Sequence, residues 1–553
     1  MQKLFFLILI MITLLLTGAN ALASGEETER QNHLPPPGKN LSSLGNVFVD
    51  HFVLEGNTVF SDEELSVITK YYENRKISAE ELQDAARKLT EYYVNNTYVN
   101  SGAVIPDQKV KDGVIRIQII EGKLIGTDVS GNTWLRDGYI LKRLALATGG
   151  GKTPLNVNRI QERLKMLKQD PKIDNINANL KPGLVRGEAV LELEVTEARP
   201  YTMGLRFNNY NSPSIGAYRG ELSLSHMNLS GWGDSLQLEY ALTEGLDEYS
   251  AVYTIPLTRW GTTLGLEVRR TESAVKAAPF DVLEIESETD TLAAELRHPL
   301  YKSLSEELNL GLRFEKRKSQ TSMINETGGR DGFGFSDGVE DDGSSRISVL
   351  RFSQEWIQRS IVQVIAARSS FGFGLDMLDA TVNDEGADGE FFCWLGQFQY
   401  LRRLPFLDSQ LLFRFDLRLS DDPLLPMEKF EIGGYSTVRG YRENQITTDN
   451  GLFTSLEWRI PAGHIKIPGL SKKTTDGLVQ ICPFYDFGKG WNTDTEDPAP
   501  DNLSSAGLGL RWTVSEKINA QIYWGYAFRD AETLPEHDLQ DDGIHFEISA
   551  FIF

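Results

Sequence analysis

The sequence predicts two small α+β domains followed by an antiparallel transmembrane β-barrel that occupies the rest of the chain. Three observations support this fold class. A unit of one strand, two helices and two more strands occurs twice before residue 199, strict alternation of apolar and polar residues then takes over, and about sixteen alternating segments follow. An even number of strands is typical of bacterial transmembrane barrels.

The first 23 residues have the features of a secretory signal. Lys3 precedes an apolar run at residues 4–16, and Ala21-Leu22-Ala23 predicts cleavage after Ala23. A membrane anchor is the weaker alternative, because the run is shorter than the roughly twenty residues of a spanning helix. Residues 24–46 then form a polar linker that is stiffened by three consecutive prolines.

The first predicted domain covers residues 47–122. It opens with a strand at 47–54, and Ser61 and Ser78 each precede a glutamate by three residues, which is the capping-box pattern that starts a helix. Two helices are therefore expected. Two strands should end the domain, at 103–105 and 114–120.

The second predicted domain, residues 123–198, repeats this order. Ile160, Leu164 and Leu167 recur at helical spacing on its second helix. In its last strand every second residue from Ala189 to Val195 is apolar, which is typical of a strand with one buried face.

Residues 199–553 are predicted to form the barrel, with clear alternation at 410–418 and 518–526. A soluble β-sandwich also alternates, but three features favour a barrel in a membrane. The apolar face continues through every segment, the opposite face carries charges of both signs, and short turns contrast with long acidic connections such as residues 319–343.

The connection at residues 420–449 is far longer than an ordinary turn. It carries aromatic and aliphatic residues with glycines between them, unlike a disordered loop, so we expect it to fold back and pack. Its central cation, Arg439, would then need a buried carboxylate, and Asp486, flanked by aromatic residues, is the candidate. A solvated arginine on a surface loop is the alternative.

The composition argues against some classes of function. A formal net charge of −22 argues against a nucleic-acid partner, because phosphate-binding surfaces need clustered Lys and Arg. Cys393 and Cys482 are expected to be free, packed thiols, with a disulfide as the alternative. Metal-ligand spacing is not found in the sequence, so we expect neither a metal nor a cofactor.

Two short stretches of the sequence resemble enzyme motifs. Gly149-Gly150-Gly151-Lys152-Thr153 resembles the end of a phosphate-binding loop, but the first glycine of that pattern is missing and no strand is predicted before it. Gly334-Phe335-Ser336-Asp337-Gly338 matches a nucleophile elbow, but it lies in a stretch rich in glycine and aspartate. An esterase that uses Ser336 is a minor alternative, and we expect no enzyme.

Several short patterns occur together in this chain. They are Gly56-Asn57, Ile105-Pro106-Asp107-Gln108, Ile120-Glu121-Gly122-Lys123, Gly131-Asn132, Val438-Arg439-Gly440-Tyr441 and Phe484-x-Asp486-x-Gly488. In this combination the sequence resembles the two-partner secretion transporters, a family of the superfamily that joins POTRA domains to an outer-membrane barrel. The resemblance covers about residues 47–553.

The resemblance implies a sixteen-stranded barrel in the outer membrane of a Gram-negative bacterium, with both POTRA domains in the periplasm. The loop at 420–449 would fold into the lumen and meet the wall through two groups of residues. These are Val438, Arg439, Gly440 and Tyr441 in the loop, and Phe484, Asp486 and Gly488 in the wall. Family members often carry an N-terminal plug helix, but residues 25–32 leave room for at most a two-turn helix.

The implied function is the export, without ATP, of one large unfolded exoprotein of the haemolysin or adhesin type. Outer-membrane lipid and, during biogenesis, the barrel-assembly machinery would be further partners. An unfolded client can add a strand to the edge of a POTRA sheet. The candidate residues are Ala103, Val104, Ile105, Ile176, Ala178 and Leu180, whose alternative role is packing on their own helices. An assembly insertase and a passive porin are the alternative functions.

Overall fold

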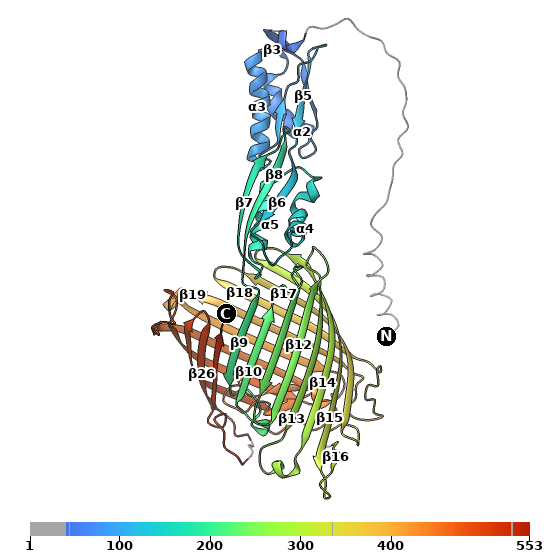
Figure 1. Ribbon diagram of the computed structural model, residues 1–553, viewed down its shortest axis with the longest axis vertical. Coiled ribbons are helices and arrows are strands. Elements are labelled where there is room, and N and C mark those ends of the chain that lie inside the picture. Colours follow the sequence, from blue (N-terminus) through green and yellow to red (C-terminus); the bar gives the residue numbers. More distant parts are fainter. Residues whose placement is uncertain (1–39, 44, 335, 532–534, 553) are drawn as a thin grey trace. The chain divides into compact units, whose positions relative to one another are not determined.

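The computed structural model describes residues 40–43, 45–334, 336–531 and 535–552 (Figure 1). The predicted signal, residues 1–23, and linker residues 24–39, including the region of a plug helix, lie outside the described residues. The chain divides into two compact units, Met1–Leu89 with Ala103–Ile119, and Thr90–Gly102 with Ile120–Phe553.

The first α+β domain contains a three-stranded sheet of order β2-β5-β4, in which β2 and β5 run parallel. Ser61 and Ser78 each accept a hydrogen bond from the backbone N–H of the glutamate three residues later, as the capping boxes predict. The elements are β1 (Asn46–Val49), β2 (His51–Glu55), α2 (Asp62–Thr69), β3 (Arg75–Ser78), α3 (Ala79–Asn95), β4 (Gly102–Val104) and β5 (Val114–Ile120).

The strand predicted at 47–54 is interrupted at Asp50, where the chain changes partner. β1 pairs with β3, whereas β2 pairs with β5. The side chains reflect the break, because Val47 and Val49 are buried and the next buried residue, Phe52, is out of phase with them. Strand β3 was not predicted, since its four residues contain a single buried side chain, Ile77.

The second α+β domain has the predicted order of elements. Its sheet has the order β6-β8-β7, with β6 parallel and β7 antiparallel to β8. Ile160 and Leu167 on the second helix are buried against every second residue of β8, from Ala189 to Val195. The elements are β6 (Lys123–Ser130), α4 (Asp137–Thr148), α5 (Val157–Lys168), β7 (Ile173–Pro182) and β8 (Glu188–Glu197).

Sixteen antiparallel wall strands among the described residues form a closed barrel, in which β27 pairs with β9, as the predicted fold class requires. A short strand, β16 (Arg330–Gly332), extends β15. The wall strands are β9 (Tyr201–Asn208), β10 (Arg219–His226), β11 (Ser235–Leu242), β12 (Leu246–Pro256), β13 (Thr263–Ala274), β14 (Glu286–Lys302), β15 (Glu306–Ile324), β17 (Ser344–Arg359), β18 (Gln363–Gly374), β19 (Phe392–Leu404), β20 (Ser409–Ser420), β23 (Asn450–His464), β24 (Leu478–Trp491), β25 (Asn502–Ser515), β26 (Ile518–Ala527) and β27 (Ile544–Phe551).

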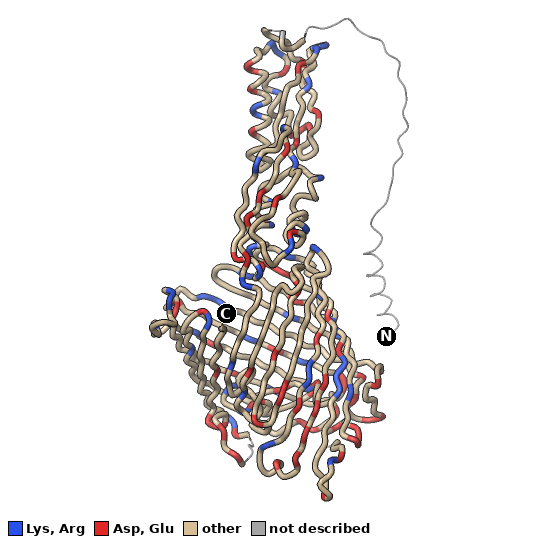
Figure 2. Tube along the Cα trace, viewed as in Figure 1, with Lys and Arg blue, Asp and Glu red and all other residues tan. Residues whose placement is uncertain are grey.

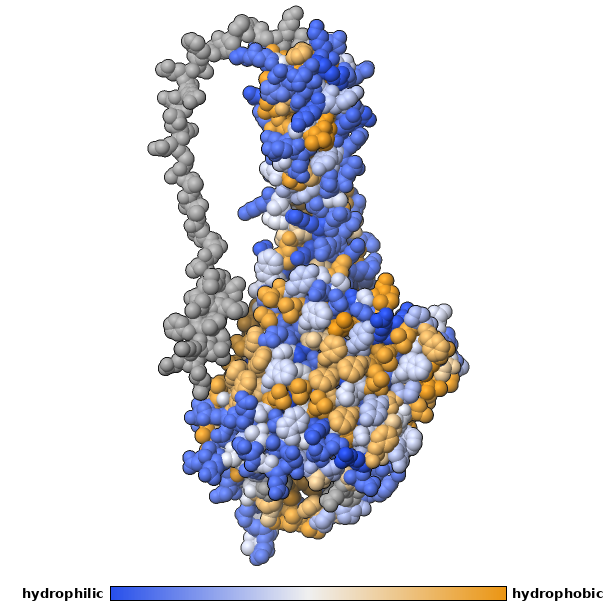
Figure 3. All heavy atoms as spheres, turned by 180° about the vertical axis from the view of Figure 1, so that it is seen from behind, coloured by the Kyte–Doolittle hydropathy of each residue, from blue (hydrophilic) through white to orange (hydrophobic). Residues whose placement is uncertain are grey.

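Alternation along the wall separates an apolar outer face from a polar inner one. Large apolar side chains such as Leu266 and Leu292 are exposed on the outer face, whereas Glu457 and Asp486 are buried inside. Figure 3 shows the apolar residues gathered over the outer wall, and Figure 2 shows charges of both signs along the wall strands. This distribution is expected for a barrel with a polar interior that is surrounded by lipid.

Two predicted details of the barrel can be compared with the structure. Residues 319–343 are not one long loop, because β15 continues to Ile324 and β16 lies between it and β17. Cys393 and Cys482 are both buried and free, as expected. Within the described part of the chain, no helix is long and apolar enough to cross a membrane.

Glu197, the last residue of β8, caps the turn before α4. Its carboxylate accepts hydrogen bonds from the backbone N–H groups of Thr133, Trp134 and Leu135 at 2.9, 2.7 and 2.6 Å. Burial alone would raise the pKa of Glu197, but these donors outweigh it, and the pKa is lowered.

Glu197→Ala is expected to loosen this turn, because three backbone N–H groups, one of them on the buried Leu135, lose their charged acceptor at a cost of about 1–3 kcal/mol. Hydrogen exchange at residues 133–135, corrected for intrinsic rates, should rise about tenfold or more. In the wild type the lowered pKa contributes stability above the unfolded value of about 4.3, and this stability is lost as the pH falls through the folded value. Glu194→Ala, at an exposed position of the same strand, is the control. Unchanged exchange in Glu197→Ala would contradict the capping role.

Candidate functional site

The connection between β20 and β23 is a folded loop that packs on the inner face of the wall. Within it, β21 (Phe430–Ile432) and β22 (Ile446–Thr448) pair in antiparallel fashion. A buried apolar cluster joins this loop to β23 and β25. Its members are Ile432, Val438, Tyr441, Ile446, Phe453 and Leu503. The inward loop, as we call residues 420–449, therefore has a core that it shares with the wall.

Two glycines allow the backbone of the inward loop to approach the wall. Gly440 has a φ of 95°, and a Cβ there would lie 2.8 Å from the carbonyl oxygen of Gly525 on β26. At Gly488 on β24, a Cβ would lie 2.4 Å from Ile432 Cγ2 and 2.9 Å from Val438 Cγ2. A side chain at either position would push the loop away from the barrel.

Arg439 lies at the centre of this contact, with only 2 % of its surface exposed. Its Nε donates to Asp486 Oδ2 at 2.8 Å and its Nη2 to Asp486 Oδ1 at 3.0 Å, which is a bidentate pair. Its backbone N–H also donates to Asp486 Oδ2, at 3.2 Å. On the neighbouring strand β23, Glu457 Oε2 accepts from Nη1 at 2.5 Å and Ser455 Oγ from Nη2 at 3.3 Å.

Two aromatic rings complete the arginine site. The guanidinium carbon of Arg439 lies 3.7 Å from the ring centre of Phe484 and 4.8 Å from that of Tyr523. Stacking on ring faces favours a cation electrostatically in a desolvated site. Glu457 also binds Arg459, through Oε1 at 2.7 Å. The ion pairs of the site therefore join two arginines to two carboxylates.

The structure brings together all seven residues that the sequence singled out here: Val438, Arg439, Gly440, Tyr441, Phe484, Asp486 and Gly488. Sequence reasoning missed Glu457 and Tyr523. Glu457 could have been found, because it is the one carboxylate on the polar face of the alternating segment at 450–464. Tyr523 carried no comparable signal, since tyrosine is common in barrel strands.

The inward loop also contacts residues in and beside the β9–β27 junction. Tyr435 stacks on Tyr210, which follows β9, with ring centres 3.9 Å apart and planes 3° apart. Gln521 of β26 donates to the hydroxyl of Tyr435 at 2.7 Å. On β27, His545 Nε2 accepts a hydrogen bond from the backbone N–H of Gly440 at 3.3 Å. We call these contacts the junction clasp.

A second carboxylate–arginine cluster holds the first part of the inward loop. Glu428 is buried and accepts from Arg351 Nη2 of β17 at 2.6 and 2.8 Å and from Arg418 Nη2 of β20 at 3.3 Å. Arg317 of β15 lies 3.8 Å away. Here the loop supplies the anion and the wall the cations, which is the reverse of the arrangement around Arg439.

The candidate client-binding residues lie at the ends of the two α+β sheets. Strand β4, with Ala103 and Val104, is the last strand of the order β2-β5-β4, and β7 is the last of β6-β8-β7. Ile105 follows β4 directly. On β7, Ile176 and Leu180 pack partly on the domain core, whereas Ala178 is exposed.

The described residues contain no group of His, Cys, Asp and Glu arranged to hold a metal ion. Gly149–Gly151 form a 3-10 turn directly after α4, and Ser336 lies in a bend between β16 and β17. Neither string follows a strand and opens a helix, as the enzyme motifs require.

Removing one wall carboxylate is expected to be tolerated better than removing both. Asp486→Asn or Glu457→Gln leaves Arg439 one anionic partner, whereas the double variant leaves a buried cation unpaired, at a cost of about 3–5 kcal/mol. The measurement is the temperature at which the barrel loses its compact mobility in semi-native electrophoresis, expected to be lowest for the double variant. Glu239→Gln, on β11, is the control, and equal transition temperatures for single and double variants would refute the shared role.

Comparisons with known proteins identify the family. A family model described as "Haemolysin secretion/activation protein ShlB/FhaC/HecB" matches residues 187–512, and one described as "POTRA domain, ShlB-type" matches residues 47–122. The heme/hemopexin transporter protein HuxB of Haemophilus influenzae is 22 % identical over 448 residues, which cover 77 % of this chain and 73 % of that protein. The outer membrane transporter CdiB of Dickeya dadantii is 23 % identical over 484 residues, or 85 % and 81 % of the two chains.

Solved structures show the same fold. CdiB from Escherichia coli has a TM-score of 0.65 at 17 % identity and covers 97 % of this chain and 93 % of its own. BamA from Haemophilus ducreyi, lacking POTRA domains 1–3, has a TM-score of 0.55 at 14 % identity, with 92 % and 100 % covered. The family match, the closed barrel and the α+β domains before it agree. The chain belongs to the ShlB/FhaC/HecB family of haemolysin secretion/activation proteins, the outer-membrane transporters of two-partner secretion, whose POTRA domains lie in the periplasm.

Proposed function

We propose that the protein recognises one large unfolded exoprotein in the periplasm and exports it through the barrel without ATP. The observation that carries the proposal is a closed wall whose inner face holds a folded loop, with the buried Arg439 at the centre of the contact. Such a loop can occupy the passage at rest and leave it when a client enters.

Recognition is proposed to use the edges of the POTRA sheets. A strand at the end of a sheet offers main-chain hydrogen-bonding groups to an extended peptide, with little demand on the peptide's sequence. That suits a client that arrives unfolded. Strand β7 is the stronger candidate of the two, because it is ten residues long, whereas β4 has three. The exposed side chain of Ala178 would lie beside the added strand.

Movement of the inward loop is proposed to open the passage. The charged contacts of Arg439 are concentrated on two carboxylates of adjacent strands, so a displaced loop would lose them together. A ligand shifts such a two-state equilibrium only by its different affinity for the two states. The client would therefore have to compensate for the lost Arg439 contacts by its own contacts with the lumen.

The energy for export is proposed to come from the client. The periplasm holds no nucleotide pool, and the one phosphate-loop-like string lies in a turn between two helices. Folding of the exoprotein outside the cell would prevent its return and so bias the movement. We propose a client of the haemolysin or adhesin type, with outer-membrane lipid and the assembly machinery as further partners.

An assembly insertase is the second candidate, because the fold is shared with BamA at a TM-score of 0.55. Insertases of this superfamily usually carry more POTRA domains than the two α+β domains described here. The two functions predict different losses when the protein is removed. Loss of one secreted protein from the medium supports export, whereas a general loss of outer-membrane barrels supports assembly.

Arg439→Ala is expected to leave the barrel inserted but to abolish secretion of the partner exoprotein. Buried Asp486 loses its cation and Glu457 keeps only Arg459, at a cost of about 3–5 kcal/mol, which is enough to repopulate a two-state loop. The measurement is the amount of exoprotein in the medium relative to barrel in the outer membrane. Arg359→Ala, at an exposed wall position, is the control. Undiminished export by Arg439→Ala would exclude the loop contact from the mechanism.

Ala178→Lys is expected to weaken client binding, because a lysine on an edge strand opposes the addition of another strand. The measurement is the affinity of the purified transporter for the N-terminal part of its exoprotein, expected to fall about tenfold. Asn158→Lys, on the exposed face of α5, adds the same charge away from the edge. If both variants bind equally well, the β7 edge is not the client site.

A further inference from the structure

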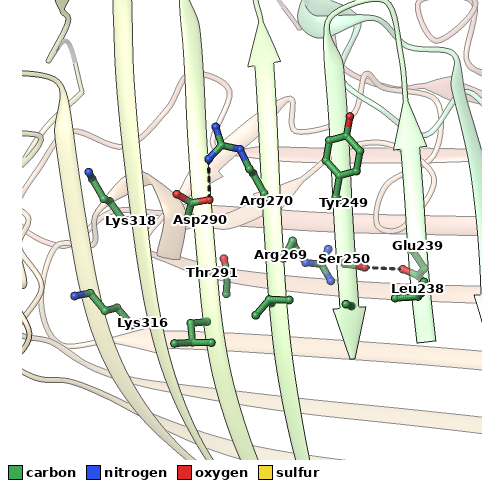
Figure 4. Close-up of a pocket in the computed structure, with 13 residues that line it drawn as sticks. Leu238, Glu239, Tyr249, Ser250, Arg269, Arg270, Asp290, Thr291, Lys316 and Lys318 are labelled. Atoms are coloured by element: carbon green, nitrogen blue, oxygen red, sulfur yellow. Dashed lines mark hydrogen bonds and ion pairs between the residues drawn. The ribbon is translucent and has the colours of Figure 1, made fainter. Parts of the chain in front are cut away.

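The outer face of β13 and β14 changes from apolar to charged at one level. In the register, Val268 lies opposite Leu292, and the next outward pair along the strands is Arg270 with Asp290. On β15, Lys318 lies opposite Asp290. Figure 4 shows Arg270, Asp290 and Lys318 side by side across the three strands, with Lys316 two residues before Lys318 on β15, opposite Leu292.

The cations at this level differ in their partners. Arg270 is held by three carboxylates: Glu272 at 2.7 Å, Glu288 at 2.9 Å and Asp290 at 3.5 Å. None of the ion pairs among the described residues includes Lys316 or Lys318. Lys318 interacts electrostatically with Asp342, but neither lysine is within ion-pair distance of a carboxylate in the described part of the chain, so both ammonium groups can meet an anion from outside the protein.

A shallow hollow of about 710 Å³ adjoins these lysines. Its floor is apolar, since Leu238, Val268 and Leu292 line it and are 40 %, 52 % and 60 % exposed. A small water-soluble anion would pair with the lysines alone and make no contact with this floor. A molecule with both an anionic group and hydrocarbon chains would cover the floor as well as pair with the lysines.

The level of the hollow in the membrane follows from the chain path. The barrel begins at Tyr201, directly after the periplasmic POTRA domains, so the end of β13 at Thr263 is periplasmic and the end at Ala274 is extracellular. Arg270 and Lys318 lie toward the extracellular ends of their strands. The lysines are thus placed at the extracellular boundary of the apolar belt, where the head groups of the outer leaflet lie.

We propose that this hollow binds a phosphorylated glycolipid of the outer leaflet, lipopolysaccharide. Lys316 and Lys318 bind a phosphate of its lipid anchor, and the acyl chains cover Val268 and Leu292. Basic residues at a membrane surface recognise anionic head groups in this way. The carboxylates around Arg270 keep that arginine turned to the protein, so the lysines carry the recognition.

The test uses the purified full-length protein in detergent, with binding of lipopolysaccharide measured by native mass spectrometry and by the thermal unfolding midpoint. Lys316→Gln/Lys318→Gln is expected to bind about 25-fold more weakly, because each basic residue contributes about 1 kcal/mol at an anionic lipid surface. Lys472→Gln/Lys473→Gln, in the turn between β23 and β24 at the opposite end of the wall, is the matched control and should bind like the wild type.

Three further ligands distinguish the sources of the anion. Dephosphorylated lipopolysaccharide is expected to lose most of the effect, and phosphatidylglycerol and inorganic phosphate are expected to give little. Equal binding by the two double variants would overturn the proposal. So would equal protection by phosphatidylglycerol, which would indicate any anionic lipid, or by inorganic phosphate, which would indicate a free anion. Unchanged compact mobility of the variants in semi-native electrophoresis verifies that they fold.

Discussion

A guanidinium removed from water has to find its full set of acceptors, and this requirement organises the barrel interior. Arg439 meets it with Asp486, Glu457 and Ser455, from two adjacent wall strands. The carboxylates are buried as deeply as the cation. Removing either the arginine or the carboxylates would therefore leave a buried charge unpaired, which costs about 3–5 kcal/mol of stability. The position of the inward loop therefore follows from charge neutralisation as much as from its apolar core.

The two charged clusters of the loop have opposite polarity. Around Arg439 the loop provides the cation, and at Glu428 it provides the anion to three wall arginines. An inverted loop would bring like charges together at both ends, which is costly because both clusters are buried. The pairing thus selects one register of the loop against the wall, in addition to stabilising it.

Much of this architecture could be predicted from the sequence, because the relevant signals are local. The capping boxes at Ser61 and Ser78, the alternation in β8 and the parity that turns Asp486 inward each need only a few neighbouring residues. What could not be predicted depends on pairing between distant segments. Strand β3 exists because β1 turns to it, and Glu457 joins Arg439 because β23 and β24 are neighbours in the wall. The stacking of Tyr435 on Tyr210 depends on closure of the barrel in the same way.

The junction clasp has a consequence for how the barrel responds to force. The register between β9 and β27 runs only from Gly204 to Asn208, shorter than that of β9 with β10. Because the inward loop contacts His545 in β27 and Tyr210 just after β9, a load that withdraws the loop also removes support from this short pairing. Linkage makes the effect reciprocal, so a strained junction would in turn loosen the loop. The inward loop and the β9–β27 junction would then yield together, as one mechanical element.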